Sequence, residues 1–366
     1  MPLIRKILPY AVLLACAFFI YLYVRNNLSD FTKIYEISTP YILLIGCACV
    51  VMLIVNGLFL RALTLSFGID LDFWEYFSIS VITNFGNIFL PMRGGTGFRG
   101  VYLKSRYDLE YSYFVSSLGA TYLVGFCITS IAALFCLGLF YANRGGYSLP
   151  VTLAFLGIAA LTTWTIASPS PSLEWIPVRW VREAANQVLS GWNIIRKSRK
   201  TVRQLCWLSL LNLVICFLIT WLEFAAFHVK DAHGNEIGFL QASIFSAIGM
   251  LSFLISITPA ALGIKESLLM FSSQFLGITQ SQALAIALLD RSINVAVTCL
   301  FFGFASIYIN KKFKISSVAS LLLGEHRGAW ASCRQLPGTP NSDLFQESTV
   351  ARQEKGPEKN RLTPIG

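Results

Sequence analysis

Two short stretches of the chain combine a proline, glycines and cations in a way that suits an anionic ligand. The first is PMRGG at residues 91–95, followed by Arg99. Backbone amides of a glycine-containing turn at a helix start can bind an anion, and arginines on either side add positive charge. We therefore expect a phosphate-binding site at Arg93, Gly95 and Arg99. The alternative is a solvated turn whose arginines only follow the positive-inside rule.

The second stretch, PAALG at residues 259–263, has the same P-x-x-x-G spacing and precedes Lys265 and Glu266. Further on, Asp290 and Arg291 lie inside a long apolar segment, where ionisable groups are costly and usually pair or line a pathway. Adjacent residues point about 100° apart on a helix, so these two cannot face one site. We expect Arg291, with Lys265 nearby, to pair with Glu266 or with a substrate phosphate. A purely structural ion pair is the alternative.

Other chemistry has little support in the sequence. Gly95, Gly97 and Gly100 formally match a dinucleotide-binding spacing, but their flanks are membrane-length apolar segments and not a βαβ unit. The histidines lack metal-ligand spacing, and the cysteines form no CxxC pair. No nucleophile arrangement and no sizeable extramembrane domain are evident, so we expect no enzyme, metal or cofactor. Glu223, near the end of an apolar span, either reaches the membrane interface or serves in proton coupling.

The composition indicates a polytopic membrane protein. Of 366 residues, 55% are apolar and only 13% are charged, against about 25% charged in soluble domains. Six apolar stretches approach or exceed the length that crosses a bilayer. They are 7–24, 41–65, 112–140, 149–168, 205–228 and 281–310. The expected fold is an all-α transmembrane helical bundle, with the first stretch an uncleaved signal anchor.

Two further apolar segments are interrupted by prolines. One ends in Pro91 and the other in Pro259, with Gly263 close behind. Proline stops a helix, and irregular backbone at membrane depth persists only inside protein or along a wet cavity. We predict two re-entrant or broken helices at corresponding places in two halves. This is the pattern of an inverted repeat with a binding site at its midplane.

Loop charges orient the chain. The formal net charge is +10, and its distribution indicates cytoplasmic loops and anionic lipid, not nucleic acid, with both termini in the cytoplasm. The amphipathic stretch 180–192 is either a surface helix or an interfacial helix on anionic lipid. The expected parts are a first transmembrane half (1–168) with a re-entrant segment near 73–100, a basic cytoplasmic connector (169–204), a second half (205–314) with a re-entrant segment near 239–278, and a disordered cytoplasmic tail (315–366).

These motifs resemble those of the lysylphosphatidylglycerol synthase transmembrane region, or flippase-like, family. Its first motif, approximately P-x-R-x-G-E-x-x-R, is matched by Pro91, Arg93, Gly95 and Arg99. Its second, P-x-x-x-G-[VI]-[RK]-E before a span with an internal arginine, is matched by Pro259, Gly263, Ile264, Lys265, Glu266 and Arg291. The resemblance covers about 5–315. Thr96 replaces the acid of the first motif, and 112–130 lacks the family's Glu-Arg pair, which argues against acid chemistry in the first half.

The resemblance implies lipid handling in a bacterial inner membrane. Our leading hypothesis is a translocase that moves a phosphate-bearing lipid between leaflets, with Arg93, Arg99 and Arg291 holding the headgroup. The alternative is an accessory protein that does not transport, but binds a lipid-linked precursor or docks a separate glycosyltransferase or aminoacyl transferase. A third hypothesis, an intramembrane enzyme acting on lipid phosphate, would need acid and base groups beyond Glu223, Glu266 and Asp290.

Overall fold

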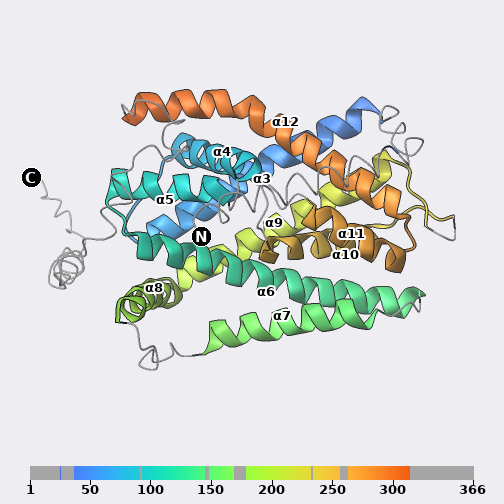
Figure 1. Cartoon of the computed structure of the whole chain (residues 1–366), viewed down its shortest axis with the longest axis horizontal. Coiled ribbons are helices and arrows are strands. Elements are labelled where there is room, and N and C mark those ends of the chain that lie inside the picture. The colour runs from blue at the N-terminus through green and yellow to red at the C-terminus, as the bar shows by residue number, and fades with distance from the viewer. Residues whose placement is uncertain are drawn as a thin grey trace, which may run out of the picture. The chain divides into compact units, whose positions relative to one another are not determined.

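The computed structural model describes residues 25, 37–90, 93–144, 148–168, 179–231, 234–255 and 263–313. The described part is helical, with one isolated bridge between Lys230 and Glu236. Its main helices are α3 (Thr39–Leu65), α4 (Phe73–Phe89), α5 (Gly94–Tyr107), α6 (Tyr111–Arg144), α7 (Leu149–Ala167), α8 (Arg179–Lys197), α9 (Arg199–Ala226), α10 (Phe239–Leu251), α11 (Ile264–Ser273) and α12 (Gln280–Phe313) (Figure 1). The predicted all-α class is confirmed. Pro91, Pro259, the span 7–24 and the tail 315–366 lie outside the described residues.

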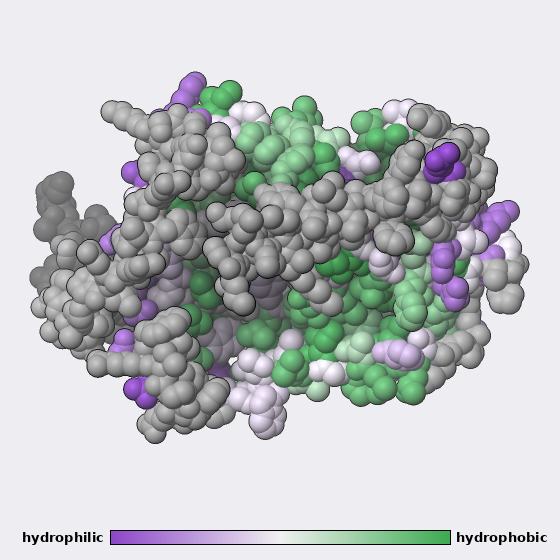
Figure 2. All heavy atoms as spheres, viewed as in Figure 1, coloured by the Kyte–Doolittle hydropathy of each residue, from purple (hydrophilic) through white to green (hydrophobic). Residues whose placement is uncertain are grey.

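Five of the described helices are long and apolar enough to cross a membrane: α3, α6, α7, α9 and α12. They correspond to five of the six predicted spans. Figure 2 shows apolar side chains over the middle of the visible face and hydrophilic ones toward its two ends, as a membrane-embedded bundle requires. Helix α9 begins at Arg199, inside the predicted connector, because the Ser198 hydroxyl caps it by accepting the Thr201 amide at 3.3 Å.

Both interrupted segments are pairs of short helices. Helix α4 ends at Phe89, the next residue, Leu90, has the extended backbone that suits a position before proline, and α5 starts after Arg93. In the second half, α10 runs into a 3-10 turn, η3 (Ser252–Ile255), and α11 starts after Gly263. Figure 1 shows the outer ends of α4 and α5 toward the end of the bundle where α8 lies, and those of α10 and α11 toward the opposite end. Each pair therefore turns back, as a re-entrant segment does.

The packing of the first half recurs in the second. Helix α4 packs against α3, α5 and α12, and α10 packs correspondingly against α9, α11 and α6. In Figure 1, α3 and α12 run toward the α8 end, whereas α9 and α6 start there. The equivalent helices thus run in opposite directions. This is the arrangement of an inverted repeat, and it brings the inner ends of both re-entrant pairs into the bundle.

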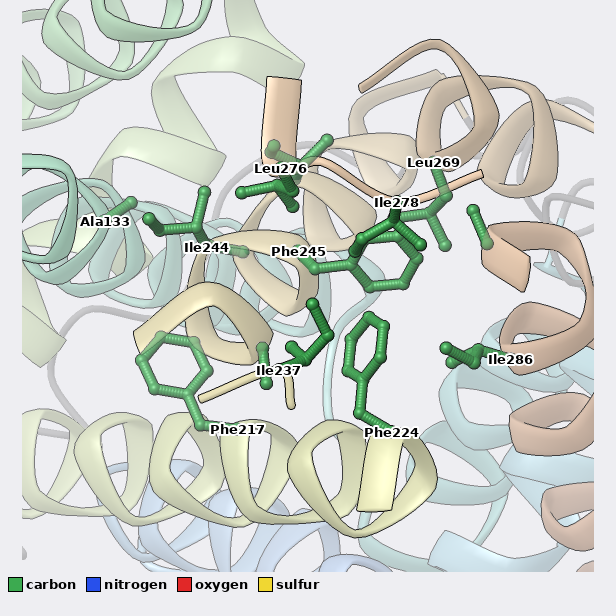
Figure 3. Close-up of a cluster of buried hydrophobic side chains, with 14 of the residues drawn as sticks. Ala133, Phe217, Phe224, Ile237, Ile244, Phe245, Leu269, Leu276, Ile278 and Ile286 are labelled. Carbon is green, nitrogen blue, oxygen red and sulfur yellow. The ribbon is translucent and has the colours of Figure 1, made fainter. Parts of the chain in front are cut away.

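Each re-entrant pair has its own apolar core. One cluster surrounds α4 and α5 and includes Ile79, Ile82 and Tyr102. The other surrounds α10 and α11; there Phe217 and Phe224 of α9 point toward α10 (Figure 3). Because lipid tails are as apolar as these side chains, close packing and interhelical hydrogen bonds must hold such helices together.

Candidate functional site

Arg93 connects the two re-entrant segments. It begins α5 in the left-handed conformation, with φ 54°, which is strained for a residue with a side chain and is typical of functional sites. Its guanidinium donates to the Tyr122 hydroxyl of α6 and to the Phe253 carbonyl of η3, the latter at 3.0 Å. It also lies 5.2 Å from the centroid of each of these two rings. A cation of the first break therefore contacts the second.

Arg99 lies on the same short helix and is not neutralised. Its side chain is half-buried, its Nε is buried, and it makes no hydrogen bond or ion pair to any described residue. The Tyr122 side chain is close enough to Arg99 to interact with it electrostatically. The same tyrosine hydroxyl accepts a hydrogen bond from Arg93. Arg93 and Arg99, both predicted site residues, thus lie near the same tyrosine. Arg99 has no acidic partner among the described residues, so its positive charge is not compensated by any of them.

A groove opens beside Arg93. It has a volume of about 490 Å³ and lies between α6, α7 and η3, with Tyr122, Phe126, Leu161 and Leu254 among its walls. Arg93 is the one charged residue among the described residues that line it. An apolar groove that ends at a cation matches an amphiphile with an anionic headgroup.

Gly95 serves packing more than ligand binding. A Cβ on Gly95 would lie 1.9 Å from the Thr83 carbonyl oxygen and 2.8 Å from the Asn87 nitrogen, so α5 approaches the backbone of α4 too closely for any side chain. The next amide, that of Thr96, donates to the Asn87 side chain at 3.1 Å. This amide is therefore already hydrogen-bonded within the protein and is not free to bind a ligand.

Gly95→Ala is expected to lower the free energy of unfolding by about 2 kcal/mol, because α5 must shift away from α4. Gly97→Ala is the matched control on the same helix, since a Cβ there would meet nothing within 4 Å. The control should be neutral or slightly stabilising. Unfolding in detergent micelles measures both variants. Equal stability of the two would contradict the close packing of Gly95.

The second break holds two ion pairs between α11 and α12. Arg291 Nη2 lies 2.7 Å from Glu266 Oε1, with side chains 18% and 2% exposed, and Lys265 pairs with Asp290. The other oxygen of Glu266 accepts the Gly263 amide at 2.7 Å and so caps α11. The predicted pairing of Arg291 with Glu266 is confirmed. The adjacent residues 290 and 291 take different partners, as their angular separation requires.

The Glu223 side chain is buried inside the helical bundle. Its side chain on α9 is 2% exposed, and its Oε1 has no hydrogen-bond partner among the described residues. Asp290 and Lys265 are its electrostatic neighbours. The expectation that Glu223 reaches the membrane interface is wrong, because α9 turns this side chain into the bundle.

The two halves differ in charge at equivalent places. Tyr122 and Arg291 are equally far from the starts of α6 and α12, which have the same length. Arg291 meets an acid of the second break, whereas Tyr122 meets a cation of the first. Lys265, Glu266, Asp290 and Arg291 at the second break are therefore paired with one another. At the first break, Thr96 stands where the family motif has an acid, and Arg93 and Arg99 have no acidic partner among the described residues.

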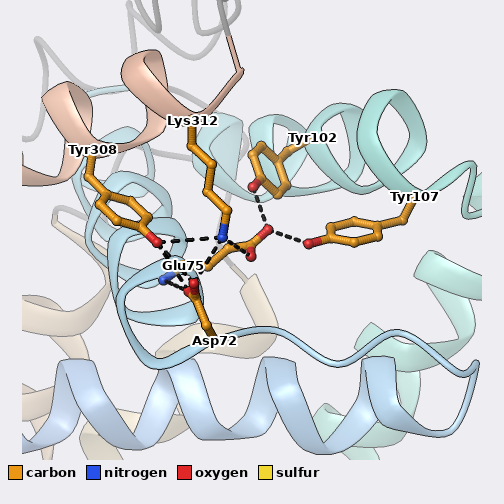
Figure 4. Close-up of polar contacts among 6 residues, drawn as sticks. All are labelled: Asp72, Glu75, Tyr102, Tyr107, Tyr308 and Lys312. Carbon is orange, nitrogen blue, oxygen red and sulfur yellow. Dashed lines mark hydrogen bonds and ion pairs between the residues drawn. The ribbon is translucent and has the colours of Figure 1, made fainter.

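One further buried acid, Glu75, was not predicted from the sequence. Glu75, on the first turn of α4, is 2% exposed and accepts hydrogen bonds from Tyr102 (2.7 Å), Tyr107 (2.5 Å) and Lys312 (2.8 Å) (Figure 4). Asp72 caps α4 and accepts from Lys312 at 2.9 Å. Burial alone would raise the pKa of Asp72, but hydrogen bonds from Lys312, the Glu75 amide and Tyr308 outweigh it, so the pKa lies below its ordinary value. These groups fasten the end of α12 to α4 and α5.

The sequence does contain a helix-start signal for two residues of this cluster, Asp72 and Glu75. Asp72 followed by Glu75 before an apolar run is typical of a helix start. No local pattern connects it to Lys312, which is far along the chain. Among the described residues, no group of histidine, cysteine and carboxylate side chains is suited to a metal ion.

The family model described as lysylphosphatidylglycerol synthase TM region matches residues 7–301, most of the chain and both re-entrant segments. No curated protein matches the chain.

Proposed function

The chain belongs to the lysylphosphatidylglycerol synthase TM region family of integral membrane proteins, and from this premise we propose that it is a lipid translocase. Its substrate is a phosphate-bearing lipid or lipid-linked precursor, which it moves between leaflets without acting as an enzyme. The observation that carries the proposal is the pair Arg93 and Arg99, placed where the two re-entrant segments meet and without an acidic partner among the described residues.

The charge of this site favours an anion over a cation. An uncompensated arginine inside a membrane protein is costly, and such groups mark substrate pathways. A phosphate would accept hydrogen bonds from the guanidinium groups and remove that cost. The opposite break already pairs its arginine with Glu266 at 2.7 Å, so it has less need of an external anion.

The groove supplies the apolar part of the same ligand. With its wall of α6 and α7 side chains, it would hold part of an acyl or prenyl chain while the headgroup rests on Arg93 and Arg99. Because the two re-entrant pairs enter from opposite ends (Figure 1), opening one pair and then the other would expose the headgroup to each side in turn. Rocking of inverted repeats about a fixed site produces this alternation.

The orientation is part of the proposal. The end that holds α8 and the end of α12 carries Lys104, Arg106, Lys197, Lys200 and Lys311. By the positive-inside rule this end faces the cytoplasm, with both chain termini on that side. We place the protein in the cytoplasmic membrane of a bacterium, following the family resemblance.

The test is translocation in liposomes that contain the purified full chain. Probes are phosphatidylglycerol and phosphatidylcholine with a fluorescent group on one acyl chain, and dithionite measures the fraction that reaches the outer leaflet. Arg93→Gly keeps the left-handed backbone while removing the charge. With Arg99→Gln added, movement of phosphatidylglycerol should slow at least about tenfold, the effect of losing roughly 1.4 kcal/mol of headgroup binding.

Lys104→Gln is the matched control, because Lys104 lies on the same helix but at its exposed end, paired with Asp108 at 2.6 Å. It should translocate at the wild-type rate. A double variant as fast as the wild type would remove the arginines from the mechanism. A wild-type protein that retains these lipids but moves neither would favour the accessory-protein alternative.

A further inference from the structure

A second pocket, with no described lining residue in common with the groove, lies where α8 packs on the bundle. It has a volume of about 300 Å³ and is enclosed by α6, α7, α8 and the start of α9. Arginines line one part of it, and apolar side chains that include Trp192, Ile166 and Leu205 line the rest. No acidic residue is among its described lining residues.

The pocket is built by close packing of α8 on α6. A Cβ on Gly191 would lie 2.5 Å from the Ser116 hydroxyl oxygen, which donates to the Val188 carbonyl at 2.6 Å. Arg196 then reaches across to the end of α7, where it donates to the carbonyls of Ala167 (2.9 Å) and Ser168 (2.6 Å). Its charge complements the negative end of the α7 dipole. Arg196 therefore lines the pocket, but its guanidinium is already hydrogen-bonded to backbone carbonyls.

Two other arginines are free to take a ligand. Arg199 and Arg203 are one turn apart on α9, so they project from one face of the helix. Both are exposed and make no hydrogen bond or ion pair to any residue that the structure describes. They lie in the first turns of α9, where the helix dipole adds positive potential.

We propose that this pocket binds one anionic phospholipid of the leaflet that faces the α8 end. Its phosphate would rest between Arg199 and Arg203, and its glycerol and upper acyl carbons would lie against Trp192 and Ile166. Trp192 suits this level, because its indole is amphipathic and tryptophans gather where bilayer and water meet. Basic pockets between transmembrane helices on the cytoplasmic side are typical sites for such headgroups.

This lipid is not the translocated substrate. The pocket shares no described lining residue with the groove beside Arg93. A lipid bound between α6, α7, α8 and α9 would hold the connecting helix α8 on the membrane and join the two halves. The inference does not depend on the proposed translocase activity, because its test measures binding alone.

Trp192 provides a local signal for the test. The full chain in detergent micelles is titrated with phosphatidylglycerol carrying brominated acyl chains, which quench tryptophan on contact, and the share of Trp192 is the difference from Trp192→Phe. Arg199→Ala/Arg203→Ala should raise the lipid fraction needed for half-quenching about thirtyfold, since each of the two basic residues near an anionic surface contributes about 1 kcal/mol and about 1.4 kcal/mol is a factor of ten. Lys197→Ala/Lys200→Ala removes the same charge from neighbours outside the pocket and should leave the titration unchanged.

Two further arms decide what the pocket recognises. Brominated phosphatidylcholine should quench Trp192 much less, and inorganic phosphate alone should not displace phosphatidylglycerol. Equal quenching by both lipids, or an equal loss in both double variants, would overturn the proposal. Displacement by inorganic phosphate would also overturn it, by assigning the arginines to a free anion. The same titration with Arg93→Gly/Arg99→Gln should give the wild-type result at Trp192, which separates this site from the translocation site.

Discussion

Arg291→Met is expected to lower the free energy of unfolding by about 3–5 kcal/mol, the largest effect of any single substitution discussed for this protein. The reason is the burial of its partner. Glu266 is 2% exposed and lies 2.7 Å from Arg291, so removing the guanidinium leaves a carboxylate inside the bundle with the Gly263 amide as its remaining partner among the described residues. Unfolding of the purified chain in micelles, followed by loss of helical signal, measures the change.

The double variant Glu266→Gln/Arg291→Met isolates the ion pair. Glutamine can still accept the Gly263 amide through its side-chain oxygen, so the cap of α11 is kept while both charges are removed. Most of the lost stability should return, because neutral replacement of a buried ion pair is often nearly neutral. A double variant no more stable than Arg291→Met would contradict the pairing.

The same double variant separates a structural from a substrate-binding role of Arg291. If Arg291 only holds α12 against α11, the double variant, with its stability restored, should translocate lipid at close to the wild-type rate. If Arg291 also holds a headgroup, the protein should be stable but inactive. Exchanging the two charges is a less direct test, because arginine at position 266 cannot accept the Gly263 amide.

The transmembrane helices were predictable because their signal is local. About twenty consecutive apolar residues must form a helix in a bilayer, whatever their neighbours. The breaks were predictable for a similar reason: the prolines and glycines act on their own backbone, and α4 and α11 end and begin beside them. Even the pairing of Glu266 with Arg291 followed from the cost of a lone charge at membrane depth.

Contacts between distant segments were not predictable. Nothing local indicates that Gly95 must clear the Thr83 carbonyl, or that Arg93 reaches the Phe253 carbonyl of the other half. A glycine in a loop motif suggested ligand binding, whereas its position against α4 shows a packing role. Tyr122 gave no signal in the sequence, because an aromatic residue in an apolar span is ordinary until its partner is known.

Lys312 is the clearest example of such a long-range partner. From the sequence it is one of several lysines at the predicted cytoplasmic end of the last span. In the fold its ammonium lies 2.8 Å from Glu75 and 2.9 Å from Asp72 (Figure 4). Both acids come much earlier in the chain. A lysine that the sequence suggests only as a sign of orientation is therefore also the partner of a buried acid.

Lys312→Met is accordingly expected to lower the free energy of unfolding by about 2–4 kcal/mol. The variant leaves Glu75 buried with two tyrosine hydroxyl donors and without the Lys312 ammonium, and a buried charge without its partner is strongly destabilising. The lower end of this range reflects the 30% exposure of the Lys312 side chain, which lets water screen the pair. The pKa of Asp72 is lowered, so its share is present at neutral pH and is lost only as the pH falls through that lowered value. The comparison is therefore made at pH 7.

Lys311→Met is the matched control, because Lys311 is the adjacent, exposed lysine and its loss changes the net charge equally. It should cost less than about 0.5 kcal/mol, as surface substitutions usually do.

Adding Glu75→Gln to Lys312→Met should restore part of the stability, since the buried charge is then gone and the amide oxygen still accepts from tyrosine. If the two lysine variants lost the same stability, Lys312 would matter for orientation in the membrane alone. If only Lys312→Met is destabilised and Glu75→Gln rescues it, the cluster is what fastens the end of α12 to the first re-entrant pair. Movement of that pair during translocation would then have to carry the end of α12 with it.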